Sequence, residues 1–360
     1  MLTELFLSLV DRFTWLNVFG YLTFRGICSV ITALLIGMLA GPRIIDLLQR
    51  LSVGQVIRED DVPFHAGKSG IPTMGGLLIL LCVTVSTLLW ADLGSRLIWI
   101  VIGTFVVFAA IGFVDDYLKI KRRNSKGLIP SRKLALQVIA GLGVGFVLYL
   151  TSTTDAQLEY IVPVVKDVVV SAGIWFIPIT ALILVSASNG VNLTDGLDGL
   201  AIMPIVMIAA GFAVFCYLTG HAEFSRYLQI PYIEGAGELV VFCGSLVGGG
   251  LAFLYFNCHP AQMFMGDVGA ISLGAVIAVV AVIVRQEVVL FIMCGVFVIE
   301  TMSVILQVAS YKLLGRRVWL MSPIHHHFEL KGWQESKIVV RFWILSLIFV
   351  LIGLATLKIR

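Results

Sequence analysis

The sequence predicts an all-α integral membrane protein with about ten transmembrane helices and a single polytopic domain over residues 1–360. Composition gives the first reason: the chain is 59% hydrophobic and only 13% charged, whereas soluble domains carry about 25% charged residues. Apolar runs of about 20 residues, long enough to cross a bilayer, recur along the whole length and give the second reason.

The expected spans follow these apolar runs in order. They lie at residues 22–42, 72–92, 97–114, 134–152, 172–188, 200–219, 238–257, 269–285, 288–310 and 338–357. The boundary between the spans 269–285 and 288–310 is the weakest, because only a tight turn at Arg285-Gln286-Glu287 separates the two apolar runs. Residues 1–19 contain acidic residues and no basic n-region, so they do not fit a secretory signal peptide.

The loops between ten spans alternate between two sides of the membrane. Most of the 25 Lys and Arg residues fall in the loops of one side, at residues 43–71, 115–133, 189–199, 258–268 and 311–337. Positively charged loops stay in the cytoplasm, so we expect these loops inside and both termini outside. The unusual polar clusters lie in the same loops, which predicts one active site at the cytoplasmic face.

Two adjacent aspartates, Asp115 and Asp116, end the third predicted span. Successive helical side chains point about 100° apart, so both reach one site only near a helix end. A solvated helix terminus is the simplest interpretation. However, acids at a helix C-terminus oppose the macrodipole, and a role in Mg²⁺ binding or proton abstraction would justify that placement.

The loop at residues 189–199 combines amides, carboxylates and a hydroxyl with three glycines. Its candidate ligand-binding residues are Asn189, Asn192, Asp195, Gly196 and Asp198. An Asx-rich turn needs only one or two such residues, and the Glu that a calcium loop requires at its twelfth position is absent. We therefore interpret this segment as a ligand-binding loop.

A second polar loop joins the seventh and eighth spans and contains Asn257, Phe264 and Asp267. Asp267 directly precedes an apolar run, so N-capping of the eighth span is one role for it. Metal ligation is compatible with capping, because a carboxylate has lone pairs to spare. Phe264 either anchors the loop at the membrane interface or stacks on a planar ligand.

The remaining candidates are more scattered. Lys68 and Thr73 lie near several glycines, which suggests phosphate contact, but the segment does not satisfy the Walker A pattern. The basic run from Lys119 to Lys133 serves topology or attracts anionic lipid. In the ninth span, Gln307 borders the expected site, whereas Glu300 on the same helical face is structural or protonated.

Three adjacent histidines, His325, His326 and His327, lie between two apolar segments. Imidazole is costly near lipid unless it contacts anions, metals or other polar groups. Consecutive histidines rarely direct their rings to one zinc ion, and no cysteine or spaced histidine accompanies them. We therefore expect this triplet to contact an anion beside the carboxylates of the other loops.

Together these motifs resemble those of the polyprenyl-phosphate N-acetylhexosamine-1-phosphate transferases over essentially the whole chain. The shared motifs are Lys68 with Pro72-Thr73-Met74-Gly75-Gly76, Phe113-Val114-Asp115-Asp116, residues 189–199, Phe264-Met265-Gly266-Asp267 and Pro323-Ile324-His325-His326-His327. The histidines followed by Phe328-Glu329-Leu330-Lys331-Gly332-Trp333 resemble the muramoyl-pentapeptide branch of this family.

This resemblance implies a Mg²⁺-dependent reaction of UDP-N-acetylmuramoyl-pentapeptide with undecaprenyl phosphate, giving lipid I and UMP in the bacterial inner membrane. It also implies periplasmic termini, a homodimer and no nucleic-acid partner. Implied roles are metal binding by Asp267 and Asp116 and proton abstraction by Asp115. Implied substrate-binding residues are Lys68, Thr73, Asn189, Asn192, Asp195, Gly196, Asp198, Asn257, Phe264, Gln307, His325, His326 and His327.

Three alternatives remain open at this point. A sibling enzyme would use UDP-N-acetylglucosamine instead. A secondary transporter also suits ten spans, although transporter sites usually lie near the bilayer midplane. A non-catalytic scaffold would tolerate substitution of Asp267. Direct attack by the lipid phosphate is our hypothesis for the transferase, against a covalent intermediate on an aspartate.

Overall fold

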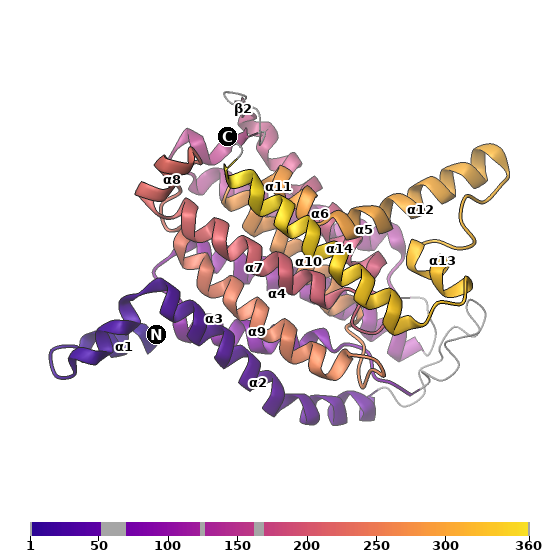
Figure 1. Ribbon diagram of the computed structural model, residues 1–360, viewed down its shortest axis with the longest axis horizontal. Helices are drawn as coiled ribbons and strands as arrows, with labels where there is room; N and C mark the ends of the chain where they lie inside the picture. Colours follow the sequence, from indigo (N-terminus) through magenta and orange to yellow (C-terminus); the bar gives the residue numbers. More distant parts are fainter. Residues whose placement is uncertain (1, 52–69, 123–126, 162–168, 359–360) are drawn as a thin grey trace.

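The computed structural model describes residues 2–51, 70–122, 127–161 and 169–358 as a bundle of helices (Figure 1). Its helices are α1 (Leu2–Ser8), α2 (Leu22–Leu51), α3 (Gly76–Trp90), α4 (Arg96–Arg122), α5 (Pro130–Thr151), α6 (Phe176–Thr194), α7 (Ile202–Thr219), α8 (Ala222–Leu228), α9 (Leu239–Asn257), α10 (Gly266–Ile283), α11 (Glu287–Met293), α12 (Gly295–Leu314), α13 (Ile324–Leu330) and α14 (Glu335–Ala355). The described residues also form five short 3₁₀ segments: η1 (Thr14–Gly20), η3 (Asp155–Leu158), η4 (Gly173–Trp175), η5 (Ala236–Glu238) and η6 (Thr356–Lys358).

The all-α membrane class is confirmed. Within the described ranges, nine helices are long and apolar enough to cross a membrane. The strands of the described chain are β1 (Glu159–Ile161) and β2 (Val169–Ser171), which pair as a short antiparallel hairpin.

The second predicted span is shorter than expected. Residues 72–92 contain the 15-residue helix α3, which begins only at Gly76. The residues before it run beside a distant loop: the Phe264 amide donates to the Pro72 carbonyl at 2.9 Å, and the Gly75 amide donates to the Phe264 carbonyl at 2.8 Å. Met74 has φ +72°, which lies outside the right-handed helical region, so the residues before Gly76 leave the helix and pair with the loop instead.

The ninth predicted span is broken. Residues 288–310 fall on α11 and α12, which are interrupted at Cys294. Gly295, the first residue of α12, packs so closely on the Phe349 ring that a Cβ atom there would approach it to 2.6 Å. After this break α12 projects away from the other helices, with α13 beside it (Figure 1).

Helix α10 forms the centre of the bundle, and all its residues after Gly266 are buried. It packs against α3, α4, α6 and α7. Glycine allows the closest of these contacts: a Cβ atom on Gly112 of α4 would collide with the Asp267 carbonyl of α10. This close packing brings the start of α10 against the last turns of α4, and so sets the position of the polar cluster described next.

Candidate active site

Three carboxylates converge where α4 meets the start of α10. Oxygen atoms of Asp115, Asp116 and Asp267 lie within 4.8 Å of one another. The Lys119 ammonium sits among them, 2.6 Å from Asp115, 3.1 Å from Asp116 and 2.7 Å from Asp267. Lys133, from the first turn of α5, adds a second ammonium 2.9 Å from Asp267.

The expectation that Asp115 and Asp116 end their helix is wrong. Helix α4 continues to Arg122, so both aspartates lie inside it. The extra turn is favourable because Lys119 pairs with both acids at i+4 and i+3. Basic residues in the last turn of α4 also complement the helix dipole.

Asp267 does not cap α10. The helix begins at Gly266 and its N-cap position is Met265, so Asp267 lies within the first turn. Its carboxylate accepts hydrogen bonds from Lys119, Lys133 and the Asn192 side-chain amide. Gly266 has φ +70°, and a Cβ atom there would lie 2.5 Å from an Asp116 oxygen, so glycine suits both its conformation and its contacts.

Only part of the predicted loop at residues 189–199 is a loop. Asn189 and Asn192 belong to the last turns of α6, and the chain leaves the helix at Asp195. This helical geometry sends the Asn192 amide to Asp267, whereas the Asn189 amide donates to Gln137 and to the Val185 carbonyl, both at 2.8 Å.

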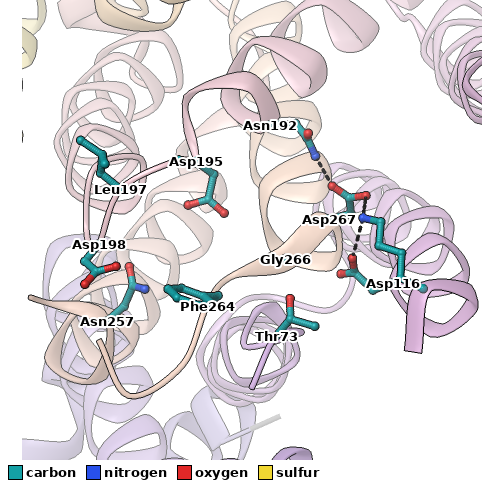
Figure 2. Close-up of a pocket in the computed structure, with 12 residues that line it drawn as sticks. Thr73, Asp116, Asn192, Asp195, Leu197, Asp198, Asn257, Phe264, Gly266 and Asp267 are labelled. Carbon is teal, nitrogen blue, oxygen red and sulfur yellow. Dashed lines mark hydrogen bonds and ion pairs between the residues drawn. The ribbon is translucent and has the colours of Figure 1, made fainter. Parts of the chain in front are cut away.

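The Asp195 carboxylate points into the space between Phe264 and Asp267 (Figure 2). Burial raises the pKa of Asp195 to about 7, and the carboxylates of Asp267, Asp116 and Asp198 add to this increase. Asp195 therefore ionises less readily near neutral pH than an ordinary aspartate.

A cavity of about 290 Å³ opens beside the carboxylate cluster (Figure 2). Its lining combines residues from α3, α4, α6, α9 and α10 and the segments that flank them. The lining residues are Thr73, Asp116, Lys119, Asn192, Asp195, Gly196, Leu197, Asp198, Asn257, Phe264, Gly266 and Asp267. We call this space the polar cavity. It brings together nine of the residues that the sequence singled out as candidates.

A second cavity, of about 740 Å³, also borders this cluster. It shares Lys119, Asn192 and Asp267 with the polar cavity. The rest of its wall combines apolar with charged groups: Asp115, Arg122, Gly127, Leu128, Ile129, Pro130, Lys133, Leu134 and Asn189. We call this space the basic groove, because its apolar wall carries three cationic side chains.

The histidine triplet lies on the short helix α13 and lines neither cavity. His325 is fully buried, with Nδ1 3.2 Å from Glu300 Oε1. Its ring packs against Gly196, where a Cβ atom would collide with it. His326 pairs with Glu329 at 2.6 Å, and the His327 ring accepts the Leu320 amide at 3.2 Å.

Two further candidates differ in outcome. Gln307 was expected to border the site, but its side chain holds the backbone of Val318 and Trp319 through three hydrogen bonds of 2.9–3.0 Å. The Gln307 amide thus provides hydrogen-bond partners for the backbone of the segment that follows α12. Lys68 lies outside the described residues.

Sequence reasoning missed the roles of Lys119 and Lys133. A signal for Lys119 existed, because it stands three and four residues after two acids in a helix that continues past them. Lys133 meets Asp267 only through tertiary packing, so no local pattern could have indicated it.

The carboxylate cluster fits a divalent cation. Carboxylate oxygens are the ligands that Mg²⁺ prefers, and here three such groups surround a point where a cationic ammonium lies. Asp116 and Asp267 face the polar cavity, and Asp115 and Asp267 face the basic groove. A cation held by them would therefore be reached from both cavities.

Comparison with protein families agrees with this arrangement. The family model of glycosyl transferase family 4 matches residues 98–285. The chain belongs to glycosyl transferase family 4. This match covers the chain from α4 to just beyond α10, and so includes the carboxylate cluster, the turn after α6 and Phe264.

Within this glycosyl transferase, residues 68–80 match signature 1 of phospho-N-acetylmuramoyl-pentapeptide-transferase. The signature covers Thr73 and the start of α3. The expected family is confirmed, and with it a multi-pass membrane transferase of peptidoglycan synthesis.

Proposed function

We propose that this protein transfers phospho-N-acetylmuramoyl-pentapeptide from its UDP conjugate to undecaprenyl phosphate, giving lipid I and UMP in the bacterial inner membrane. The observation that carries the proposal is the meeting of two unlike cavities at one carboxylate cluster, with Lys119 and Asp267 in both walls. A reaction between a water-soluble nucleotide and a lipid phosphate needs such a pair of entrances.

The polar cavity suits the nucleotide end of the soluble substrate. Phe264 presents an aromatic side chain to this cavity, and Asn257, Asp198 and Asp195 surround it with polar groups (Figure 2). We assign stacking on uracil to Phe264, because flat aromatic rings bind each other with their faces offset. The sugar and peptide, which exceed this space, extend outward from the carboxylate cluster.

The basic groove suits the lipid phosphate. Leu128, Ile129 and Leu134 provide apolar surface, while Lys133 and Arg122 bring cationic groups to the same space. A phosphate on an apolar chain needs both kinds of contact at once. Asp115 lies in this groove and accepts the Leu128 amide at 2.8 Å, so its carboxylate is fixed where the lipid phosphate would arrive.

Direct transfer is our hypothesis for the reaction. An oxygen of the lipid phosphate forms a new bond to the sugar-linked phosphorus of the nucleotide, and the bond from that phosphorus to the bridging oxygen breaks. The electron pair leaves on that oxygen with UMP, and Asp115 takes the proton of the lipid phosphate if it carries one. Mg²⁺ held by Asp267 and Asp116 would neutralise charge on the transferred phosphoryl group.

The deciding experiment measures UMP release by the purified protein in detergent. Release that requires both UDP-N-acetylmuramoyl-pentapeptide and undecaprenyl phosphate supports the proposal, and it excludes a pure transporter because detergent has no compartments. Release with UDP-N-acetylglucosamine alone as donor would assign the sibling reaction instead. Phosphate trapped covalently on Asp115 during turnover would overturn direct attack.

We also propose that the site faces the cytoplasm and that both termini are periplasmic. Cys258 offers a test, because it is an exposed cysteine of the α9–α10 connection beside the polar cavity. A membrane-impermeant thiol reagent should label Cys258 in inverted vesicles and not in intact spheroplasts. The Cys258→Ser variant controls for labelling of the other cysteines.

A further inference from the structure

The turn that follows α6 is held in place by side chains of other segments. This turn carries Asp195, Gly196, Leu197 and Asp198, and all four line the cavity. Its backbone is fixed by side chains of two other segments: Asn257 accepts the Gly199 amide at 3.0 Å, and the Trp343 indole of α14 donates to the Gly199 carbonyl at 3.1 Å.

Glu335, in the first turn of α14, makes the contact nearest the cavity. Its Oε1 accepts the backbone amide of Asp198 at 2.8 Å. Helix α14 contributes no residue to the lining of the polar cavity in the described part of the chain. Glu335 therefore acts on the cavity through the residues that it contacts.

His259 links this contact to the connection between α9 and α10. Its Nδ1 lies 3.1 Å from Asp198 Oδ2 and 3.6 Å from Glu335 Oε2. The same Asp198 oxygen accepts the Ala261 amide at 3.2 Å. A single imidazole thus lies between two carboxylates that would otherwise repel each other, and it belongs to the connection that leads to Phe264.

We propose that Glu335 and His259 are positioning residues for binding of the nucleotide sugar, an inference that rests on the proposed function. They hold the Asp195–Asp198 turn and the Phe264 connection at a fixed separation, so that the polar cavity has its binding shape before the nucleotide arrives. Their contribution is to donor binding, and the carboxylate cluster that carries the chemistry does not touch them in any contact described above.

Kinetic constants of a variant without the Glu335 carboxylate distinguish a role in donor binding from a general structural role. A hydrogen bond to a charged acceptor is stronger than a neutral one, so Glu335→Ala should raise the KM for the nucleotide sugar about tenfold. The kcat and the KM for undecaprenyl phosphate should stay within about twofold. Glu335→Gln retains an acceptor oxygen and should recover most of the lost affinity.

A matched control is Glu223→Ala, which removes an exposed carboxylate from the first turn of α8. It should leave all three constants unchanged. His259→Ala is the second variant and should raise the same KM about threefold, with His259→Gln closer to the parent. If Glu335→Ala does not fold, as judged by its elution as a single species in detergent, the His259 pair still tests the proposal.

The results distinguish this inference from the proposed function. A parent enzyme that releases no UMP with its two substrates contradicts the proposed function. An active parent with an unchanged KM in Glu335→Ala and His259→Ala overturns only the positioning role. A fall in kcat without a change in KM, or an absence of rescue by glutamine, also overturns it.

Discussion

Two ionic clusters lie at opposite ends of α4 and differ in how their charges are matched. Near the start of the helix, Arg25 and Glu238 form a two-bonded pair, with N–O distances of 2.8 and 2.6 Å. Glu238 also accepts the Asp92 amide at 3.0 Å. Toward the end of the helix, Lys119 contacts all three carboxylates of Asp115, Asp116 and Asp267.

The difference separates a structural ion pair from a candidate reaction centre. In the Arg25–Glu238 pair each charge meets an opposite charge with matched geometry, and nothing further is needed for neutrality. In the carboxylate cluster, two lysines face three carboxylates at the edge of two cavities. The remaining negative charge is suited to a cation that arrives from outside, which makes the cluster our candidate for the site of chemistry.

The largest expected effect is on Asp267. Asp267→Asn keeps the shape of the side chain but removes the charge that Lys119, Lys133 and the proposed Mg²⁺ share. We expect UMP release to fall at least about 10²-fold, with a melting temperature within a few degrees of the parent. A variant that keeps more than a tenth of parental activity would contradict the role of Asp267 in the reaction.

The matched change in the other cluster should do the opposite. Glu238→Gln leaves Arg25, which is 7% exposed, without its anionic partner. Loss of one member of such a pair should cost about 2 kcal/mol of unfolding free energy, seen as a lower melting temperature in detergent. Activity per folded molecule should remain near the parental value. If activity falls with stability unchanged, the contrast between the two clusters fails.

How much of these clusters could be predicted from sequence depends on the distance of the contacts along the chain. Asp115, Asp116 and Asp267 stand out as polar residues at the edges of apolar runs. The alternation of loops already places them on one face, so their proximity in the structure follows from local pattern and topology. Lys133 could not be found this way, because its meeting with Asp267 depends on how α5 packs.

The same limit explains the wrong expectations. The second span lost its first residues because Pro72 pairs with Phe264, nearly two hundred positions away, and no periodicity reports such a contact. The contacts of His325 are also distant along the chain, because it is buried against Gly196 and Glu300. The contact of the histidine triplet with a substrate anion stays a prediction.

Removal of Lys119 should affect metal binding without use of an activity assay. The Lys119 ammonium lies where a cation among the three carboxylates would have to compete with it. In Lys119→Met, the Mg²⁺ concentration that gives half-maximal thermal stabilisation should fall about threefold or more. Lys312→Met, which removes a lysine from the last turn of α12, should leave this concentration unchanged. A higher requirement in Lys119→Met would show that the lysine supports the metal site rather than competing with it.

The smallest expected effect is a change in how stability depends on pH. Burial, with the neighbouring carboxylates of Asp267, Asp116 and Asp198, raises the pKa of Asp195 to about 7 from its ordinary value of 3.8. Between these two values the folded protein holds a proton that the unfolded chain releases. Stability from this proton is therefore present at low pH and lost as pH rises toward 7.

Asp195→Asn replaces the protonated carboxyl by a neutral group of the same shape and should remove this part of the slope. Melting temperatures measured in chelator between about pH 5 and pH 8 should fall less steeply for Asp195→Asn than for the parent. Glu238→Gln, in the other cluster, should keep the parental slope at a lower melting temperature. Parallel slopes for Asp195→Asn and the parent would mean that Asp195 is already ionised at low pH. The carboxylate cluster would then be better neutralised than its two lysines indicate, and the contrast with the Arg25–Glu238 pair would lose its electrostatic basis.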